Sequence, residues 1–68
     1  MKNLEFYSFS TPTCLIFWRG KKQPIPPFKT AIEANDKINE LCLCAPDQFD
    51  FYEIRAWGEI IKPVKNRV

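Results

Sequence analysis

Two short runs near the start of the chain, residues 4–9 and 13–18, are rich in aromatic and β-branched side chains. Such residues favour β-strands, and the Ser-Thr-Pro sequence at 10–12 favours a turn between them, so a β-hairpin is predicted. The second run is apolar at every position from 14 to 18 instead of alternating. This pattern predicts a central strand that is covered on both faces.

A second pair of strands is predicted near the other end of the chain. Residues 49–57 alternate with period two, and Gly58 provides a tight turn before residues 59–62. The two segments therefore predict a second hairpin. Pro63 ends it, and residues 63–68 are predicted to form a frayed basic tail.

Between the hairpins, a helix is predicted from Thr30 to about Cys42. Thr30 as N-cap and Glu33 three residues later form a capping box, and Pro46 stops the helix. Apolar residues recur with a period of 3.6 and define the face that would cover a sheet: Ala31, Ala34, Ile38, Leu41, Cys42 and Ala45.

The segment from Lys21 to Pro27 contains three prolines and has two interpretations. Prolines donate no hydrogen bond to a sheet, so extended chain that leads into the helix is predicted. The alternative is a polyproline ligand for an SH3-type groove, because a basic residue precedes two prolines at the required spacing.

These elements predict one small α+β domain over residues 1–68, with the order β-β-α-β-β. One amphipathic helix would cover one face of a mainly antiparallel sheet of about four strands, made of two hairpins. The other face of the sheet would then meet solvent or a partner. A chain of 68 residues with 46% apolar residues has enough material for one core.

Charge and cysteine content restrict the environment that we expect for the protein. The net charge of +2 is too small to attract nucleic acid or anionic lipid by itself. The N-terminal sequence does not resemble a signal peptide, and no apolar run is long enough to cross a membrane, so no membrane association is expected. Three cysteines, an odd number, predict free thiols and a cytoplasmic location, which would be the host cytoplasm if a phage encodes the chain.

The residues that usually carry catalysis are missing, so we do not expect an enzyme. There is no histidine to act as a general base, and a cysteine nucleophile would therefore have no imidazole to activate it. Cys42 and Cys44 could supply two ligands to zinc, but only Cys14 remains to complete the set, so no metal is expected. With only two glycines there is no phosphate-binding loop, and no cofactor is expected.

Two tryptophans beside glycine turns are the strongest candidates for recognition. Trp18 precedes Arg19-Gly20, and Trp57 lies between Arg55-Ala56 and Gly58. Each indole could fold back over the end of the sheet, which is the preferred interpretation for Trp18. Alternatively, an exposed Trp near an Arg is a typical anchor of a protein interface. The candidate partner-binding residues are Trp57, Arg55, Trp18, Arg19, Lys21 and Lys22.

In its length and its lack of catalytic groups, the chain is similar to small accessory proteins of phages and mobile elements. Such proteins often inhibit or adapt a host macromolecule by occluding its surface. The expected function is therefore a non-enzymatic module that binds a larger protein. The alternative is a small single-stranded nucleic-acid binder, in which Trp18 stacks on bases while Arg19, Lys21 and Lys22 contact phosphates. A homodimer is compatible with both functions.

Overall fold

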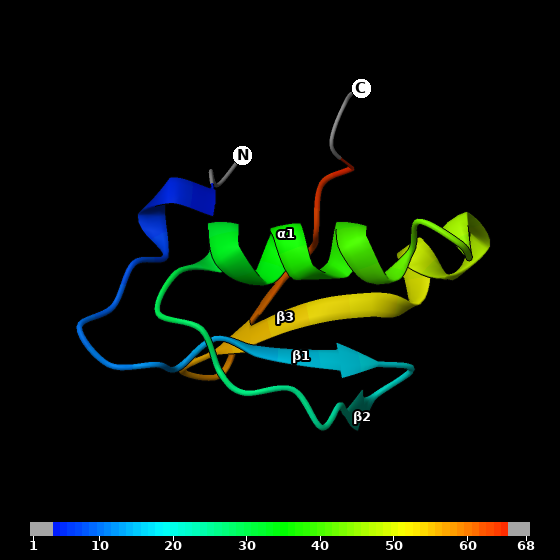
Figure 1. Ribbon diagram of the computed structural model, residues 1–68. Coiled ribbons are helices and arrows are strands. Elements are labelled where there is room, and N and C mark those ends of the chain that lie inside the picture. The colour runs from blue at the N-terminus through cyan, green and yellow to red at the C-terminus, as the bar shows by residue number, and fades with distance from the viewer. Residues whose placement is uncertain (1–3, 66–68) are drawn as a thin grey trace.

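The computed structural model describes residues 4–65 and contains one antiparallel sheet with the strand order β2-β1-β3-β4. The helix α1 lies across one face of this sheet (Figure 1). The predicted α+β fold class is confirmed. The elements are β1 (Leu15–Trp18), β2 (Lys21–Lys22), α1 (Ala31–Leu41), β3 (Tyr52–Ala56) and β4 (Glu59–Ile61).

Helix α1 begins as the sequence predicts. Thr30 has an extended φ of −128°, and its Oγ1 accepts a hydrogen bond of 3.2 Å from the backbone N–H of Glu33. The face toward the sheet contributes four buried apolar residues to the core: Ala31, Ala34, Ile38 and Cys42. Leu41, expected on the same face, is instead 38% exposed, because it lies at the edge of the apolar stripe, in the last turn of the helix.

The strand pairing divides the sheet into an inner face, which packs on α1, and an outer face. Ile16 is opposite Ile54, and Ile54 is opposite Ile61; all three side chains are buried on the inner face. Strand β1 lies between β2 and β3, so its predicted central position is confirmed. The prediction that both of its faces are covered is wrong, because Leu15 and Phe17 on the outer face are only half-buried. α1 contributes small side chains to this core, which allows the helix to approach the sheet closely.

The first predicted hairpin is wrong in its placement. Leu4–Phe6 form a short 3₁₀ helix, η1, and the strand that pairs with β1 through a tight turn is β2. The two-residue turn from β1 to β2 keeps the pairing local. Farther along, Cys14 pairs with Phe28, while the N-terminal arm bridges to the start of α1 through Ser8 and Thr30. Tyr7 and Phe9 pack against the core from this arm, so their apolar character reflects burial in a loop.

The strand predicted for residues 49–57 begins later than expected, at Tyr52. Residues Pro46–Phe51 form a second 3₁₀ helix, η2, with Pro46 in its first turn. Phe49 is buried from this helix, while Asp50 and Phe51 are exposed. A single buried aromatic residue between exposed ones fits the alternation of a strand equally well, which explains the error. The predicted hairpin of β3 and β4 around Gly58 is confirmed.

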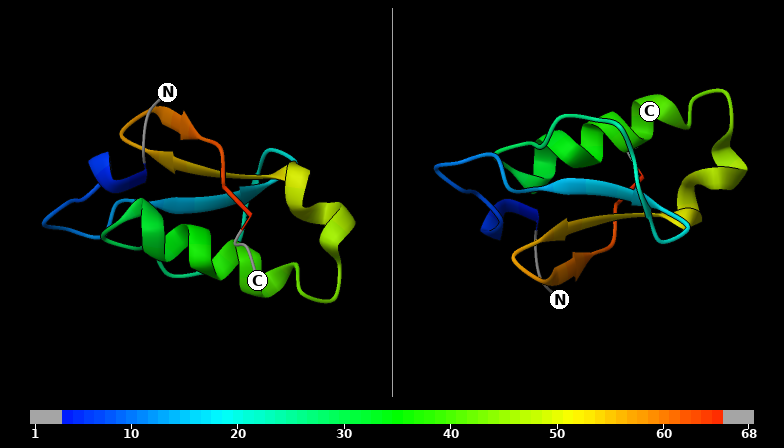
Figure 2. Two further views of the ribbon diagram at one scale, coloured as in Figure 1. Left: turned by 90° about the horizontal axis from the view of Figure 1, so that it is seen from above. Right: turned by 90° about the horizontal axis from the view of Figure 1, so that it is seen from below.

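The chain beyond β4 crosses α1 (Figures 1 and 2). Asn35, only 4% exposed, holds this segment: its Nδ2 donates to the Val64 carbonyl at 3.0 Å, and its Oδ1 accepts from the Val64 N–H at 2.6 Å. Asn39 Nδ2 donates to the same carbonyl at 3.0 Å. The segment predicted to fray is thus bound to α1 at Val64, and its residues 66–68 lie outside the described residues.

Candidate binding surface

The turn between β3 and β4 places a large aromatic side chain in solvent. Trp57 and Gly58 have φ values of 51° and 80°, and a positive φ at both central positions is the signature of a type I′ turn. Trp57 is 74% exposed. The left-handed region is unfavourable for a bulky residue, at a cost of about 1–2 kcal/mol. A type I′ turn favours Asn or Gly at this position, so Trp57 is poorly suited to its turn.

The turn between β1 and β2 repeats this backbone geometry with a different arrangement of side chains. Arg19 and Gly20 also have φ values of 51° and 80°. The Arg19 guanidinium carbon lies 5.1 Å from the centroid of the Trp18 ring and 4.3 Å from that of Phe51. Trp18 is half-buried, and its Nε1 donates to Gln48 Oε1 at 3.3 Å. This tip therefore contains an organised cation–aromatic cluster.

The outer face of the sheet is formed by Leu15, Phe17, Glu53, Arg55 and Ile60. Arg55 lies in one cross-strand row with Leu15 and Ile60. Its guanidinium carbon is 4.1 Å from the centroid of the Phe17 ring, and its Nη2 is 3.2 Å from Glu53 Oε1. Two contacts thus hold Arg55 flat on the outer face. Leu15 and Phe17 are half-buried and Ile60 is 58% exposed, so this face is mixed in character.

The six candidate residues do not form one site. Arg55 and Trp57 belong to β3 and the turn that follows it, whereas Trp18, Arg19, Lys21 and Lys22 surround the β1–β2 turn. Because β1 and β3 run antiparallel with Trp18 opposite Tyr52, the two turns lie at opposite ends of the sheet (Figure 2). Binding of a protein through Trp57 and binding of nucleic acid through the basic residues around the β1–β2 turn would therefore use separate surfaces.

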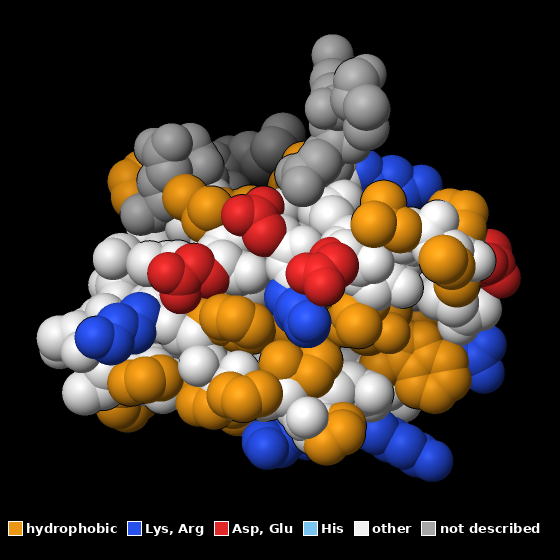
Figure 3. Space-filling model, in the orientation of Figure 1, with side chains coloured by type: hydrophobic (Ala, Val, Ile, Leu, Met, Phe, Trp, Pro, Cys, Tyr) orange, Lys and Arg blue, Asp and Glu red, His pale blue; other side chains and the backbone are white. Residues whose placement is uncertain are grey.

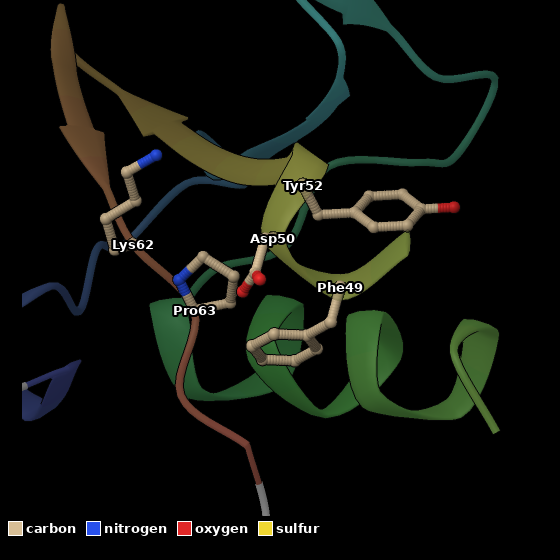
Figure 4. Close-up of a pocket in the computed structure, with 5 residues that line it drawn as sticks. All are labelled: Phe49, Asp50, Tyr52, Lys62 and Pro63. Atoms are coloured by element: carbon tan, nitrogen blue, oxygen red, sulfur yellow. The ribbon is translucent and has the colours of Figure 1, made fainter. Parts of the chain in front are cut away.

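A pocket that the sequence did not reveal lies where the segment after β4 passes η2 (Figure 4). Its volume is about 240 Å³, and its lining consists of Phe49, Asp50, Tyr52, Lys62 and Pro63. This volume is below the roughly 300–1,000 Å³ of typical small-molecule sites. No local pattern could have predicted it, because the hydrogen bonds of Asn35 to Val64 determine the path of the segment.

The buried thiols are poor nucleophiles. Burial raises the pKa of the Cys14 thiol, and the Glu33 carboxylate adds to this effect. Burial also raises the pKa of the Cys42 thiol, to which the Asp47 carboxylate contributes in the same direction. A raised pKa lowers the fraction of reactive thiolate at neutral pH. Cys44 is the exposed cysteine.

Two further properties concern residues 4–65 only. No three Cys, Asp or Glu side chains in this range lie close enough together to hold a metal ion. None of the helices that it contains has the length and apolar character needed to cross a membrane. On the side shown in Figure 3, acidic side chains lie along α1 and hydrophobic side chains gather below it, toward the sheet.

Comparison with known proteins gives no relative from which a function could be inferred: the chain matches no protein-family model, no curated protein and no solved structure.

Proposed function

We propose that the chain is a non-enzymatic protein-binding module that contacts its partner through Trp57 and the adjacent outer face of the sheet. The observation that carries this proposal is the conformation of Trp57. Its backbone is in the left-handed region and its side chain is 74% exposed. The hairpin turn accounts for this backbone conformation, which Arg19 shares, but it does not account for a bulky exposed Trp in it. Residues held in such unfavourable conformations cluster at functional sites.

The neighbouring side chains support a protein partner. Trp and Arg are enriched among the residues that dominate protein interfaces. Arg55 is already ordered by Phe17 and Glu53, so its binding to a partner would cost less side-chain entropy than for a mobile Arg. Ile60 adds apolar area in the same cross-strand row. Occlusion of a partner's surface, as an inhibitor or adaptor would do, requires no group beyond these.

The nucleic-acid alternative has less support from the geometry. Trp18 is half-buried, it bonds Gln48, and Arg19 lies over its ring, so less of this indole is left for a base to stack on. Binding of a single-stranded oligonucleotide that weakens steeply with salt, and that requires Lys21 and Lys22, would favour this alternative over our proposal.

The test compares Trp57→Asn with Leu43→Asn. Leu43 is 78% exposed and lies beyond the end of α1, outside the proposed surface, so both variants replace an exposed apolar side chain with the same residue. Asn tolerates the left-handed region, so Trp57→Asn keeps the turn. A photo-reactive residue at position 57 and, as control, at position 43 identifies a partner in lysate of the producing cell by cross-linking and mass spectrometry.

We expect a specific cross-link from position 57 only. Trp57→Asn should then weaken binding to the identified protein by about thirtyfold, the effect of a typical interface hot spot, whereas Leu43→Asn should leave it unchanged. Equal cross-linking from the two positions, or unchanged affinity of Trp57→Asn, would show that Trp57 is not the anchor.

A further inference from the structure

The two edges of the sheet differ in their ability to accept another strand. One edge is β2, which consists of two lysines and is followed by Pro24, Pro26 and Pro27. Lysine and proline are the residues with which natural proteins protect an edge. The other edge is β4, and among residues 4–65 no segment pairs with its outer side. Figure 2 shows this strand at the border of the sheet.

The pairing registers determine which backbone groups of β4 point outward. The N–H of Arg19 donates to the Phe51 carbonyl at 3.0 Å. Because hydrogen-bonded pairs alternate along an antiparallel ladder, the backbone of Arg55 bonds toward Leu15. Ile60 is opposite Arg55 on the other side of β3, so it belongs to a non-hydrogen-bonded pair. The N–H and C=O of Ile60 therefore point away from the sheet.

The sequence of this edge is complementary to itself when it is read antiparallel. Residues 59–62 are Glu, Ile, Ile and Lys, so a second copy running in the opposite direction brings the acidic end of one strand to the basic end of the other. Parallel pairing would place like charges together. With Ile60 opposite Ile60 of a second copy, Lys62 is opposite Gly58, which leaves room for its side chain beside the copy's Trp57.

We propose that two copies of this chain pair through their β4 strands, antiparallel and with Ile60 at the two-fold axis. The two Ile60 residues exchange N–H···O bonds, and their side chains, 58% exposed in the single chain, meet on the outer face. The result is a continuous eight-stranded sheet, twice the four strands of one chain, with both helices on the same side. Because β4 is the one open edge of the sheet that residues 4–65 form, the assembly closes at two copies.

This inference concerns the edge of the sheet and holds whether or not the outer face binds a partner, and its test requires only the purified protein. The decisive variant is Ile60→Pro. It removes the N–H that points outward, so it breaks no bond within the sheet and abolishes the pairing between copies. Lys22→Pro is the matched control, because Lys22 is opposite Phe17 in a non-hydrogen-bonded pair and its N–H also points outward, but from the protected edge. The hydrogen bond of 3.0 Å from the Gln23 N–H to the Ile16 carbonyl establishes this alternation.

Sedimentation equilibrium should show the mass of the chain rising with concentration from 8.0 kDa to twice that value. Lys22→Pro should behave in the same way, whereas Ile60→Pro should stay at 8.0 kDa. Ile60→Lys, which places like charges at the two-fold axis, is a second variant and should also be monomeric. Far-UV circular dichroism verifies that each variant is folded.

Mixed isotope labelling then tests the register. With Ile60 at the axis, Glu59 of one copy and Ile61 of the other form a non-hydrogen-bonded pair, whose Hα atoms should give an intermolecular NOE. A mass of 8.0 kDa up to about millimolar concentration would overturn the proposal, since mass action would then have favoured even a weak dimer. Assemblies larger than two copies, or undiminished association of folded Ile60→Pro, would also overturn it.

Discussion

The replacement Asn35→Ala tests how the segment after β4 is held on α1. The side chain of Asn35 is buried and makes two hydrogen bonds to the backbone of Val64, at 3.0 Å and 2.6 Å. Alanine removes both. The Val64 carbonyl keeps its bond from Asn39 Nδ2, but the Val64 N–H loses its acceptor, Asn35 Oδ1.

The expected loss follows from the net value of such bonds. Each hydrogen bond contributes about 1 kcal/mol, so Asn35→Ala should reduce the free energy of unfolding by about 2 kcal/mol. A domain of this length has a total stability of roughly 3–10 kcal/mol, so the variant should still fold. The midpoint of thermal unfolding should fall by about 8–16 °C, since 1 kcal/mol corresponds to about 4–8 °C in a domain of this size.

Two measurements check this reasoning. Urea unfolding gives the change in stability, and amide hydrogen exchange gives the protection of the Val64 N–H in particular. In Asn35→Ala the Val64 amide should exchange much faster than amides of β3, whereas in Asn39→Ala it should remain protected because its acceptor is intact. If Val64 stays as protected in Asn35→Ala as in the parent chain, Asn35 does not hold the segment and the reasoning is refuted.

Two further predictions concern the turn and the buried ionisable groups. Gly58→Ala should lower the free energy of unfolding, measured in urea, by about 1–2 kcal/mol, because φ is 80° at this position. A steric clash would not explain the loss, since no atom lies within 4 Å of the added Cβ. Gly58→Asn should lose less stability, and equal losses in the two variants would contradict a conformational cause. Burial raises the folded-state pKa of Cys14 and Cys42 above 9.0 and that of Tyr52 above 10.0. The stability that these groups contribute is therefore complete below their unfolded-state pKa values, and it is lost as the pH rises through their folded-state pKa values. The free energy of unfolding should therefore decline above pH 9.0, less steeply in a Cys14→Ala/Cys42→Ala variant, and an equal decline in that variant would show that the thiols are not its cause.

Local signals in the sequence predicted α1 and the second hairpin correctly. The capping box at Thr30 and the apolar period of α1 act within a few residues, and the same is true of the turn at Gly58. Patterns that were also compatible with another structure gave errors. Tyr7 and Phe9 of the N-terminal arm are partly buried from a loop, and Phe49 is buried from a short 3₁₀ helix, in patterns that resemble those of a strand.

The exposure of the two tryptophans required the tertiary structure. Each tryptophan is next to or within a turn of the same backbone geometry. Trp18 is the last residue of a strand and lies close enough to η2 to donate a hydrogen bond to Gln48, whereas Trp57 is in the turn itself. The sequence could identify both as candidates. The difference between them depends on an element that is 30 residues away from Trp18 along the chain.

The sequence by itself determined the secondary structure that underlies the fold class, the start of α1 and the turn at Gly58, because each follows from patterns among near neighbours in the chain. The tertiary structure decided which face of the sheet is open, which edge is unprotected and where the segment after β4 lies. Those features arise from pairings such as Asn35 with Val64 and Leu15 with Arg55, whose partners are far apart in sequence. Local pattern carries no information about such pairings, because their free energy exists only after the chain has brought both partners together.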